Sequence, residues 1–288
     1  MPQTLHYRDY IGCGGVALHV AVPELLPIVG RFYPAYRKRG PEPREARAVL
    51  ICLERENGSY KLTGPSGDWY ADQAGEAAAL CEAELTDALL AHASRYVYLH
   101  AAAVSDGGAC LVLIGDSGTG KSVLTFGLLL RGRQPLSDEV VLIDPSSGRI
   151  EPFRRSIRVH RQALSRFGLG EELPEGAQLI EPYLWVHPDV AARGRLQPHG
   201  VRAFVFLEHG RRTQLKRLWA SRTLQGLMVG RFGGLEAVRD FECLSRLAGE
   251  VPGYRLTVRR FPEALAELQR AFPVGEPACG VRLCREGS

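Results

Sequence analysis

The sequence predicts an α/β fold in which a mixed sheet with flanking helices follows a smaller β-rich N-terminal region. Short apolar runs separated by Gly and Pro clusters fill the first third of the chain. An apolar run that ends in a glycine-rich loop comes next, and helical and strand patterns alternate after it. The pattern changes near residue 95, so we expect a β-rich region with a closing helix over 1–95 and a second domain over 96–288.

Composition and charge narrow the class of protein. The 288 residues include 36 basic and 32 acidic side chains, and the small net charge of +4 is scattered, which favours no nucleic-acid partner. We expect neither a signal peptide nor a membrane span, because no apolar stretch approaches the roughly 20 residues that a spanning helix needs. The 7 cysteines include no C-x-x-C pair, which indicates reduced thiols in a soluble, cytoplasmic protein.

The N-terminal region consists of four short strands and a helix in this interpretation. Alternating apolar residues between Gly and Pro clusters such as 39–44 indicate the strands, and an apolar stripe at helical spacing indicates the helix. The strands are expected at 5–10, 16–22, 48–54 and 60–63, and the helix at 76–94.

A β-hairpin is expected where the second domain begins. Strands at 96–104 and 109–114 flank the turn signal SDGG. A turn at 107–108 sets His100 opposite Gly115, whereas a turn at 106–107 sets it opposite Leu113. Either register brings His100 near the loop that follows the second strand.

That loop reads GDSGTGKS and fits the pattern G-x-x-x-x-G-K-[ST]. Backbone N–H groups in such a loop hold phosphate oxygens, and the N-terminus of the next helix adds positive potential. Lys121 would reach the β- and γ-phosphates, and Ser122 would hold Mg²⁺ through its hydroxyl. The sequence therefore predicts a nucleoside triphosphate site made by Gly115, Asp116, Ser117, Gly118, Thr119, Gly120, Lys121 and Ser122.

Strands and helices alternate after the loop. A leucine-rich helix at 123–130 leads to a short strand at 134–137, expected to run parallel to 109–114, and Asp138 lies at its carboxyl end. The remaining elements are expected as a hairpin of 140–143 with 149–153, a strand pair of 201–207 with 214–218, a strand at 254–258 and helices at 221–229, 235–248 and 262–271.

Asp138 and Glu139 are the candidate acidic groups of the site. In a strictly regular strand their side chains would point to opposite faces, whereas a bend at Asp138 would let both approach the loop. Phosphoryl transfer requires a phosphate cradle, an acidic group near a metal, and a base or a water-orienting residue. A solvated strand end is the alternative interpretation of this pair.

The succession LHAAAV, GDSGTGKS and LSDE resembles the catalytic core of the HPr kinase/phosphorylase family over roughly 96–144. The resemblance implies a P-loop kinase that uses ATP and Mg²⁺. In it, Asp138 matches the aspartate that accepts the proton of the acceptor hydroxyl, and His100 matches the histidine that supports this aspartate. Lys121 matches the phosphate-binding lysine and Ser122 the metal-binding hydroxyl. Glu139 falls where the family commonly has a second aspartate near the metal.

The rest of the chain departs from that family. We find no glycine-rich second signature, and the N-terminal region does not look like the usual first domain, so HPr is not the expected substrate. The size and layout are similar to those of short kinases from lasso peptide clusters, which phosphorylate a serine hydroxyl of a precursor peptide. A nucleotide-binding regulator with slow ATPase activity and a small-molecule hydroxyl kinase are the alternatives, and the oligomeric state stays open.

Basic residues and one further carboxylate could complete the site by neutralising charge on the transferred group or by facing the metal. A solvated surface arginine is the simpler interpretation of each basic candidate, and Glu208 at the end of an apolar run is disfavoured as a metal-side residue. The basic candidates are Arg154, Arg155, Arg158 and Arg231.

Overall fold

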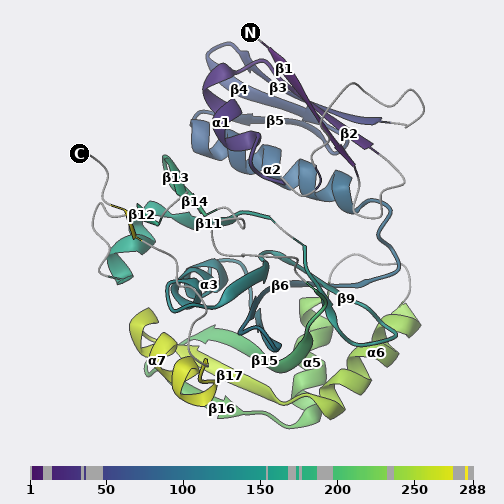
Figure 1. Cartoon of the computed structure of the whole chain (residues 1–288), viewed down its shortest axis with the longest axis vertical. Coiled ribbons are helices and arrows are strands. Elements are labelled where there is room, and N and C mark those ends of the chain that lie inside the picture. The colour runs from purple at the N-terminus through teal and green to yellow at the C-terminus, as the bar shows by residue number, and fades with distance from the viewer. Residues whose placement is uncertain are drawn as a thin grey trace. The chain divides into compact units, whose positions relative to one another are not determined.

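The computed structural model describes residues 2–8, 15–33, 36, 48–153, 155–167, 173–174, 177–186, 197–231, 237–274 and 283–284. The loop expected at 39–44 and the candidate Arg154 lie outside these residues. The chain packs as two compact units, one of 1–94 with 178–184 and the other of 95–177 with 185–288 (Figure 1). Residues 178–184, which the sequence places in the second domain, thus group with the first unit.

The first unit contains a five-stranded mixed sheet in which β2 and β3 are parallel and the other neighbours antiparallel. Its strands, in spatial order, are β1 (Gln3–Arg8), β2 (Gly15–Val20), β3 (Ala48–Glu56), β4 (Ser59–Gly64) and β5 (Gly67–Ala71). The four strands expected from the sequence are present. The sequence gives no signal for β5, because all of its residues except Ala71 are exposed and no apolar alternation marks it.

One long helix, α2 (Ala74–Leu90), packs against strands β2 to β5 of this sheet. The alternation of buried Ile51 and Leu53 with exposed Leu50 and Glu54 shows why β3 turns one face to a core. Two short helices, η1 (Pro23–Leu25) and α1 (Leu26–Val29), connect β2 toward β3 and were not expected. The closing helix ends at Leu90, before the expected residue 94.

The second unit is built on an eight-stranded mixed sheet, and its seven-strand path has the order β10-β9-β6-β7-β15-β17-β16, with β8 also pairing with β6. Strands β7, β15 and β17 are parallel, and the other pairs are antiparallel. This confirms the mixed α/β sheet. The strands are β6 (Val97–Ser105), β7 (Ala109–Ile114), β8 (Gln134–Ser137), β9 (Val140–Ile143), β10 (Ile150–Glu151), β15 (Gly200–His209), β16 (Gln214–Arg217) and β17 (Gly253–Val258).

Helices cover both faces of this sheet (Figure 1). Helices α5 (Ala220–Gly230) and α6 (Ala237–Glu250) share an apolar core with Leu99, Ile114 and Phe204 on one face. Helices α3 (Lys121–Leu129) and α7 (Phe261–Ala271) pack against each other on the opposite face. The flanking helices of the expected fold are therefore present.

Two strand pairings differ from the expectation. Strand β16 pairs with β17 and not with β15, because β15 already has a parallel neighbour on each edge, β7 and β17. Strand β8 runs in the same direction as β7, as expected, but it pairs with β6, which lies between them. The carboxyl end of β8 consequently reaches the loop across one intervening strand.

The connection between β10 and β15 holds short elements that the sequence did not predict, because its strands are only two to four residues long and too short for a clear pattern. They are β11 (Ile157–His160), η2 (Arg161–Phe167), β12 (Leu173–Pro174), β13 (Ala177–Ile180) and β14 (Tyr183–Val186), and β12 pairs with β18 (Leu283–Cys284) near the C-terminus.

Four cysteines of the described part of the chain, Cys52, Cys81, Cys110 and Cys243, are thiols. Burial is the main cause that raises the pKa of Cys110 to about 12, so this thiol stays protonated at neutral pH. Cys13 and Cys279 lie outside the described residues.

Within the described ranges, no helix combines the length and apolar character needed to cross a membrane.

Candidate active site

The register of the β6–β7 hairpin decides where His100 lies. Ala101 pairs with Ile114 and Ser105 with Cys110, which places His100 level with Gly115. The turn is at 107–108, where the N–H of Asp106 donates to the carbonyl of Ala109 at 3.2 Å. The first of the two predicted registers is therefore confirmed, and His100 lies beside the start of the loop.

The loop of residues 115–120 connects β7 to α3 and needs glycine at defined positions. Gly118 and Gly120 adopt left-handed conformations, with φ of 82° and 94°. A Cβ on Gly120 would lie 2.4 Å from ring carbons of Phe261 on α7, and one on Gly115 would lie 2.7 Å from Oγ1 of Thr119. Thr119 closes the turn, because its N–H and its hydroxyl donate to the carbonyl of Asp116 at 3.2 and 2.7 Å.

The two left-handed glycines differ in one respect, which allows a matched test. A Cβ on Gly118 meets nothing within 4 Å, whereas one on Gly120 meets Phe261. Gly118→Ala should therefore lower the free energy of unfolding by about 1–2 kcal/mol, which is the cost of holding an alanine in the left-handed conformation. Gly120→Ala should cost a further 1–3 kcal/mol, roughly, for overpacking. Denaturant unfolding of both variants measures this, and equal losses would contradict the packing of Phe261 on the loop.

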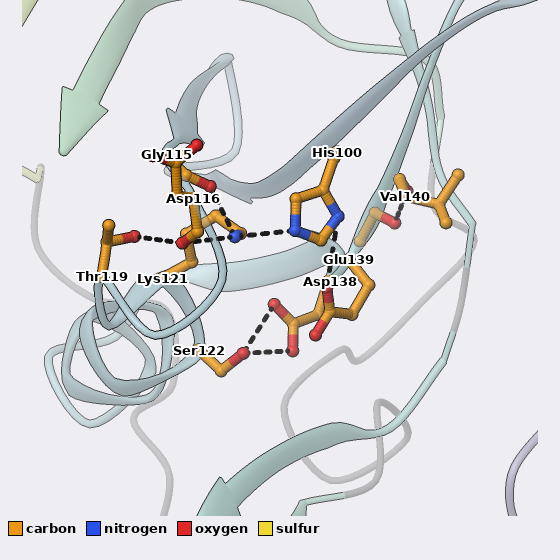
Figure 2. Close-up of polar contacts among 10 residues, drawn as sticks. His100, Gly115, Asp116, Thr119, Lys121, Ser122, Asp138, Glu139 and Val140 are labelled. Atoms are coloured by element: carbon orange, nitrogen blue, oxygen red, sulfur yellow. Dashed lines mark hydrogen bonds and ion pairs between the residues drawn. The ribbon is translucent and has the colours of Figure 1, made fainter. Parts of the chain in front are cut away.

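Lys121, the first residue of α3, lies over this loop with only 6% of its surface exposed. Its Nζ donates to the carbonyls of Gly115 at 2.7 Å and of Asp116 at 3.3 Å, and to Nε2 of His100 at 3.0 Å (Figure 2). Burial lowers the pKa of Lys121, and the nearby carboxylates oppose this shift in part. A desolvated ammonium in contact with two loop carbonyls is well placed for a polyanion.

His100 connects this lysine to the acidic pair. Burial first, and then the charge of Lys121, lower the pKa of His100, so its ring is neutral at pH 7. A lysine ammonium only donates, so Nε2 is the acceptor and the ring hydrogen is on Nδ1. That Nδ1 lies 3.4 Å from Oε2 of Glu139, and Lys121, His100 and Glu139 form a line of contacts.

Both carboxylates turn toward the site at the end of β8. Oγ of Ser122 donates to Oδ2 and Oδ1 of Asp138 at 3.0 and 3.3 Å, and Asp138 is 2% exposed. Glu139 has φ of 67°, and the N–H of Val140 donates to the carbonyl of Asp138 at 2.9 Å, which closes a tight turn (Figure 2). The bend expected at Asp138 is present, centred on Glu139, and the two carboxylates do not point to opposite faces.

The further arginine candidates have separate surroundings. Nε of Arg231 lies 2.9 Å from Oδ2 of the buried Asp240, a pairing that suits a structural role. Arg155 is buried, and its charge contributes to the lowered pKa of His100. Arg158 is half-buried in β11.

The end of β15 adds one carboxylate that was weighed from the sequence and one histidine that was missed. Glu208 accepts a hydrogen bond from the hydroxyl of Thr257 at 2.9 Å. Nε2 of His209 lies 3.3 Å from the carbonyl of Gly118 in the loop. The position of His209 could have indicated a site residue, because β15 is the parallel neighbour of β7 and ligands collect at the carboxyl ends of such strands.

The residues fit a magnesium nucleotide. The described residues contain no group of three or more His, Cys, Asp or Glu side chains that could hold a metal ion alone. Mg²⁺ usually keeps several waters and binds one or two carboxylates together with substrate phosphates, and Ser122, Asp138 and Glu139 supply such oxygen donors. The left-handed glycines leave the loop backbone open to phosphate oxygens, because no Cβ intervenes.

Comparison with known proteins gives little beyond this geometry. No protein-family model matches the sequence, and no curated protein matches it. Among chains of solved structure, the chain is similar to the HPr(Ser) kinase/phosphatase from Coxiella burnetii, with 12% sequence identity and a TM-score of 0.32. The match covers 60% of this chain and 95% of that chain. At this TM-score we draw nothing about activity from the likeness.

Proposed function

We propose that the chain is an ATP-dependent phosphotransferase, a P-loop kinase of HPr-kinase type, that phosphorylates a serine-type hydroxyl of a peptide or small protein. The observation that carries the proposal is the hydrogen bond of the Ser122 hydroxyl to the buried carboxylate of Asp138. It joins the first turn of α3 to the end of β8 directly beside the buried Lys121. A phosphate loop, a lysine and a buried carboxylate at one point are the parts that phosphoryl transfer needs.

Each residue then has a distinct role. Bound ATP would supply the γ-phosphoryl group and leave as ADP, and the Mg²⁺ ion would neutralise part of the phosphate charge. Lys121 exchanges the carbonyls of Gly115 and Asp116 for phosphate oxygens, and the loop N–H groups hold the remaining oxygens. Asp138 takes the proton of the acceptor hydroxyl, which makes the oxygen a nucleophile.

His100 and Glu139 support this centre. His100 accepts from Lys121 and faces Glu139, so it fixes the lysine between the loop and the acidic pair. Ser122 and Glu139 are the proposed oxygen ligands on the metal side. The charge of Arg155 near His100 supports a role in neutralising the transferred group.

The finer assignment of the acceptor is a ribosomal precursor peptide of the lasso type. Its support is the resemblance in size and layout to the lasso peptide tailoring kinases. The two alternative functions differ in the acceptor of the phosphoryl group. A regulator with slow ATPase activity would transfer it to water, and a small-molecule kinase would transfer it to a metabolite hydroxyl.

The test is phosphoryl transfer itself. With ATP, Mg²⁺ and candidate precursor peptides, we expect a mass gain of one phosphate on a peptide serine, lost when Mg²⁺ is chelated. Inorganic phosphate released at one rate with or without peptide would favour the slow ATPase. Phosphate found only on hydroxyl-bearing metabolites would identify a small-molecule kinase.

A further inference from the structure

A pocket of about 340 Å³ opens beside the phosphate loop, and the proposed mechanism assigns it no role. His100, Gly115 and Asp116 line it where it meets the loop, and Val229 and Arg222 line it from α5. Its volume lies at the lower end of the range for ligand pockets, about 300–1,000 Å³. It therefore suits a short segment or a small molecule rather than a folded domain.

The floor of the pocket follows one row of residues across the sheet. Ile114 of β7 pairs with Phe206 of β15, and Phe206 pairs with Arg255 of β17. On β6, Ala101 pairs with Ile114 in this row, and His100 is the next residue toward the loop. Neighbouring strands lie about 4.8 Å apart, so the row from β6 to Arg255 spans about 14 Å. That length corresponds to about four residues of extended peptide.

Helix α5 forms the wall and approaches the sheet closely through two glycines. A Cβ on Gly226 would lie 2.3 Å from the Phe206 ring, and one on Gly230 would lie 2.9 Å from Cγ2 of Ile114. Helix α3 lies on the other face of the sheet. A molecule in this pocket would thus meet the loop from the face opposite to α3.

One end of the pocket is basic, with Arg222 and Arg255, and the loop end carries the acidic Asp116. Arg222 makes no ion pair within the described part of the chain, and its Nη1 donates to the neutral Oε1 of Gln225 at 2.8 Å. Nε of Arg255 lies 3.7 Å from a carboxylate oxygen of Glu208, a loose contact between half-exposed side chains. Asp116 lies at the loop end. The arginine end favours a carboxylate, which guanidinium groups bind through paired hydrogen bonds.

We propose that this pocket holds an extended acidic segment of the peptide acceptor. The acceptor hydroxyl lies at the His100 end, apolar side chains pack on Phe206 and Val229, and a carboxylate three or four residues away binds Arg222 and Arg255. This inference rests on the proposed kinase function and adds to it a sequence preference.

The spacing is testable with synthetic hexapeptides that contain one serine and one glutamate among apolar residues. We expect kcat/KM to be highest when the two are three or four residues apart, and at least 10-fold above that of the matched glutamine peptide. Arg222→Gln and Arg255→Gln should each reduce this preference, whereas Arg131→Gln, beyond α3, should keep it. Two results would overturn the inference. One is a glutamate preference that persists in both Arg222→Gln and Arg255→Gln, and the other is the absence of any glutamate preference at every spacing tested.

The location is testable by filling the pocket. Val229 is 75% exposed, so Val229→Trp should fold normally, raise the KM for the peptide at least 10-fold and leave ATP binding and peptide-independent ATP hydrolysis unchanged. Val238→Trp, on α6 and 72% exposed, is the matched control and should change neither.

Three other outcomes separate the inference from the proposed function. Weaker ATP binding in Val229→Trp would assign the pocket to the nucleotide and overturn the inference, while peptide phosphorylation by the unaltered chain would still uphold the kinase. Transfer only to small hydroxy acids would overturn the peptide segment. Absence of transfer to any acceptor, with ATP bound, would remove the proposed function and this inference with it.

Discussion

Asp138→Asn is expected to lower kcat for phosphoryl transfer by about 10²- to 10⁴-fold, the range that a positioned general base contributes. Asparagine keeps the shape of the side chain and still offers an oxygen to the Ser122 hydroxyl, but it cannot accept a proton from the acceptor. The fold should persist, because the carboxylate is replaced by a neutral group of equal size in a buried position. Steady-state transfer assays and thermal unfolding of both proteins measure the two effects.

Glu139→Gln is the matched control, because it alters the neighbouring carboxylate. If Glu139 is the metal-side residue, this variant should need more Mg²⁺ for half-maximal rate and recover much of its kcat at saturating Mg²⁺. Asp138→Asn should not recover in this way. Recovery of Asp138→Asn by high Mg²⁺ would instead place the metal on Asp138, a role that its hydrogen bond to Ser122 also allows.

Lys121→Met is expected to reduce transfer by about 10²- to 10³-fold, the effect of losing one donor that stabilises developing charge. Methionine fills the buried space without a charge. The carbonyls of Gly115 and Asp116 and Nε2 of His100 lose a donor, and because these residues are exposed or only half-buried, water can replace it in part, so the loss of stability should be about 1 kcal/mol or less. ATP binding by calorimetry and denaturant unfolding measure the two losses.

The same variant reports on His100. The charge of Lys121 is one cause of the lowered pKa of His100, after burial, so the pKa should rise when the charge is removed. The neutral ring would then gain its proton at a higher pH than in the unaltered chain. Titration of the His100 resonances by NMR, assigned with His100→Asn, checks the direction. A fall would contradict the contact with Lys121.

The sequence predicted the parts of the site that depend on local signals. The glycine pattern fixed the loop, and the SDGG turn limited the hairpin to two registers, of which one is observed. The proximity of Asp138 and Ser122 followed from the strand after the loop helix. The conformation of Glu139 was foreseen only as a bend, because nothing in a glutamate indicates a positive φ of 67°.

Long-range pairing was harder to predict. The partners of β15 depend on β17, which lies more than 40 residues away along the chain, so the local pattern suggested the nearer β16 instead. The pocket beside α5 was not foreseen at all. It arises where one row crosses four strands, and single-strand patterns do not reveal which residues align across a sheet.

The β6–β7 turn lies at the far end of the hairpin from the loop, about 17 Å away for five residues of strand. It nevertheless sets the alignment of the site, because strand β6 is held on both edges: Ala101 against Ile114, and His100 against Val140. A slip on one edge would break hydrogen bonds on the other. Length changes at 106–109 should therefore be absorbed within the turn itself, and a chain with a longer or shorter tip there would keep its histidine between the lysine and the acidic pair.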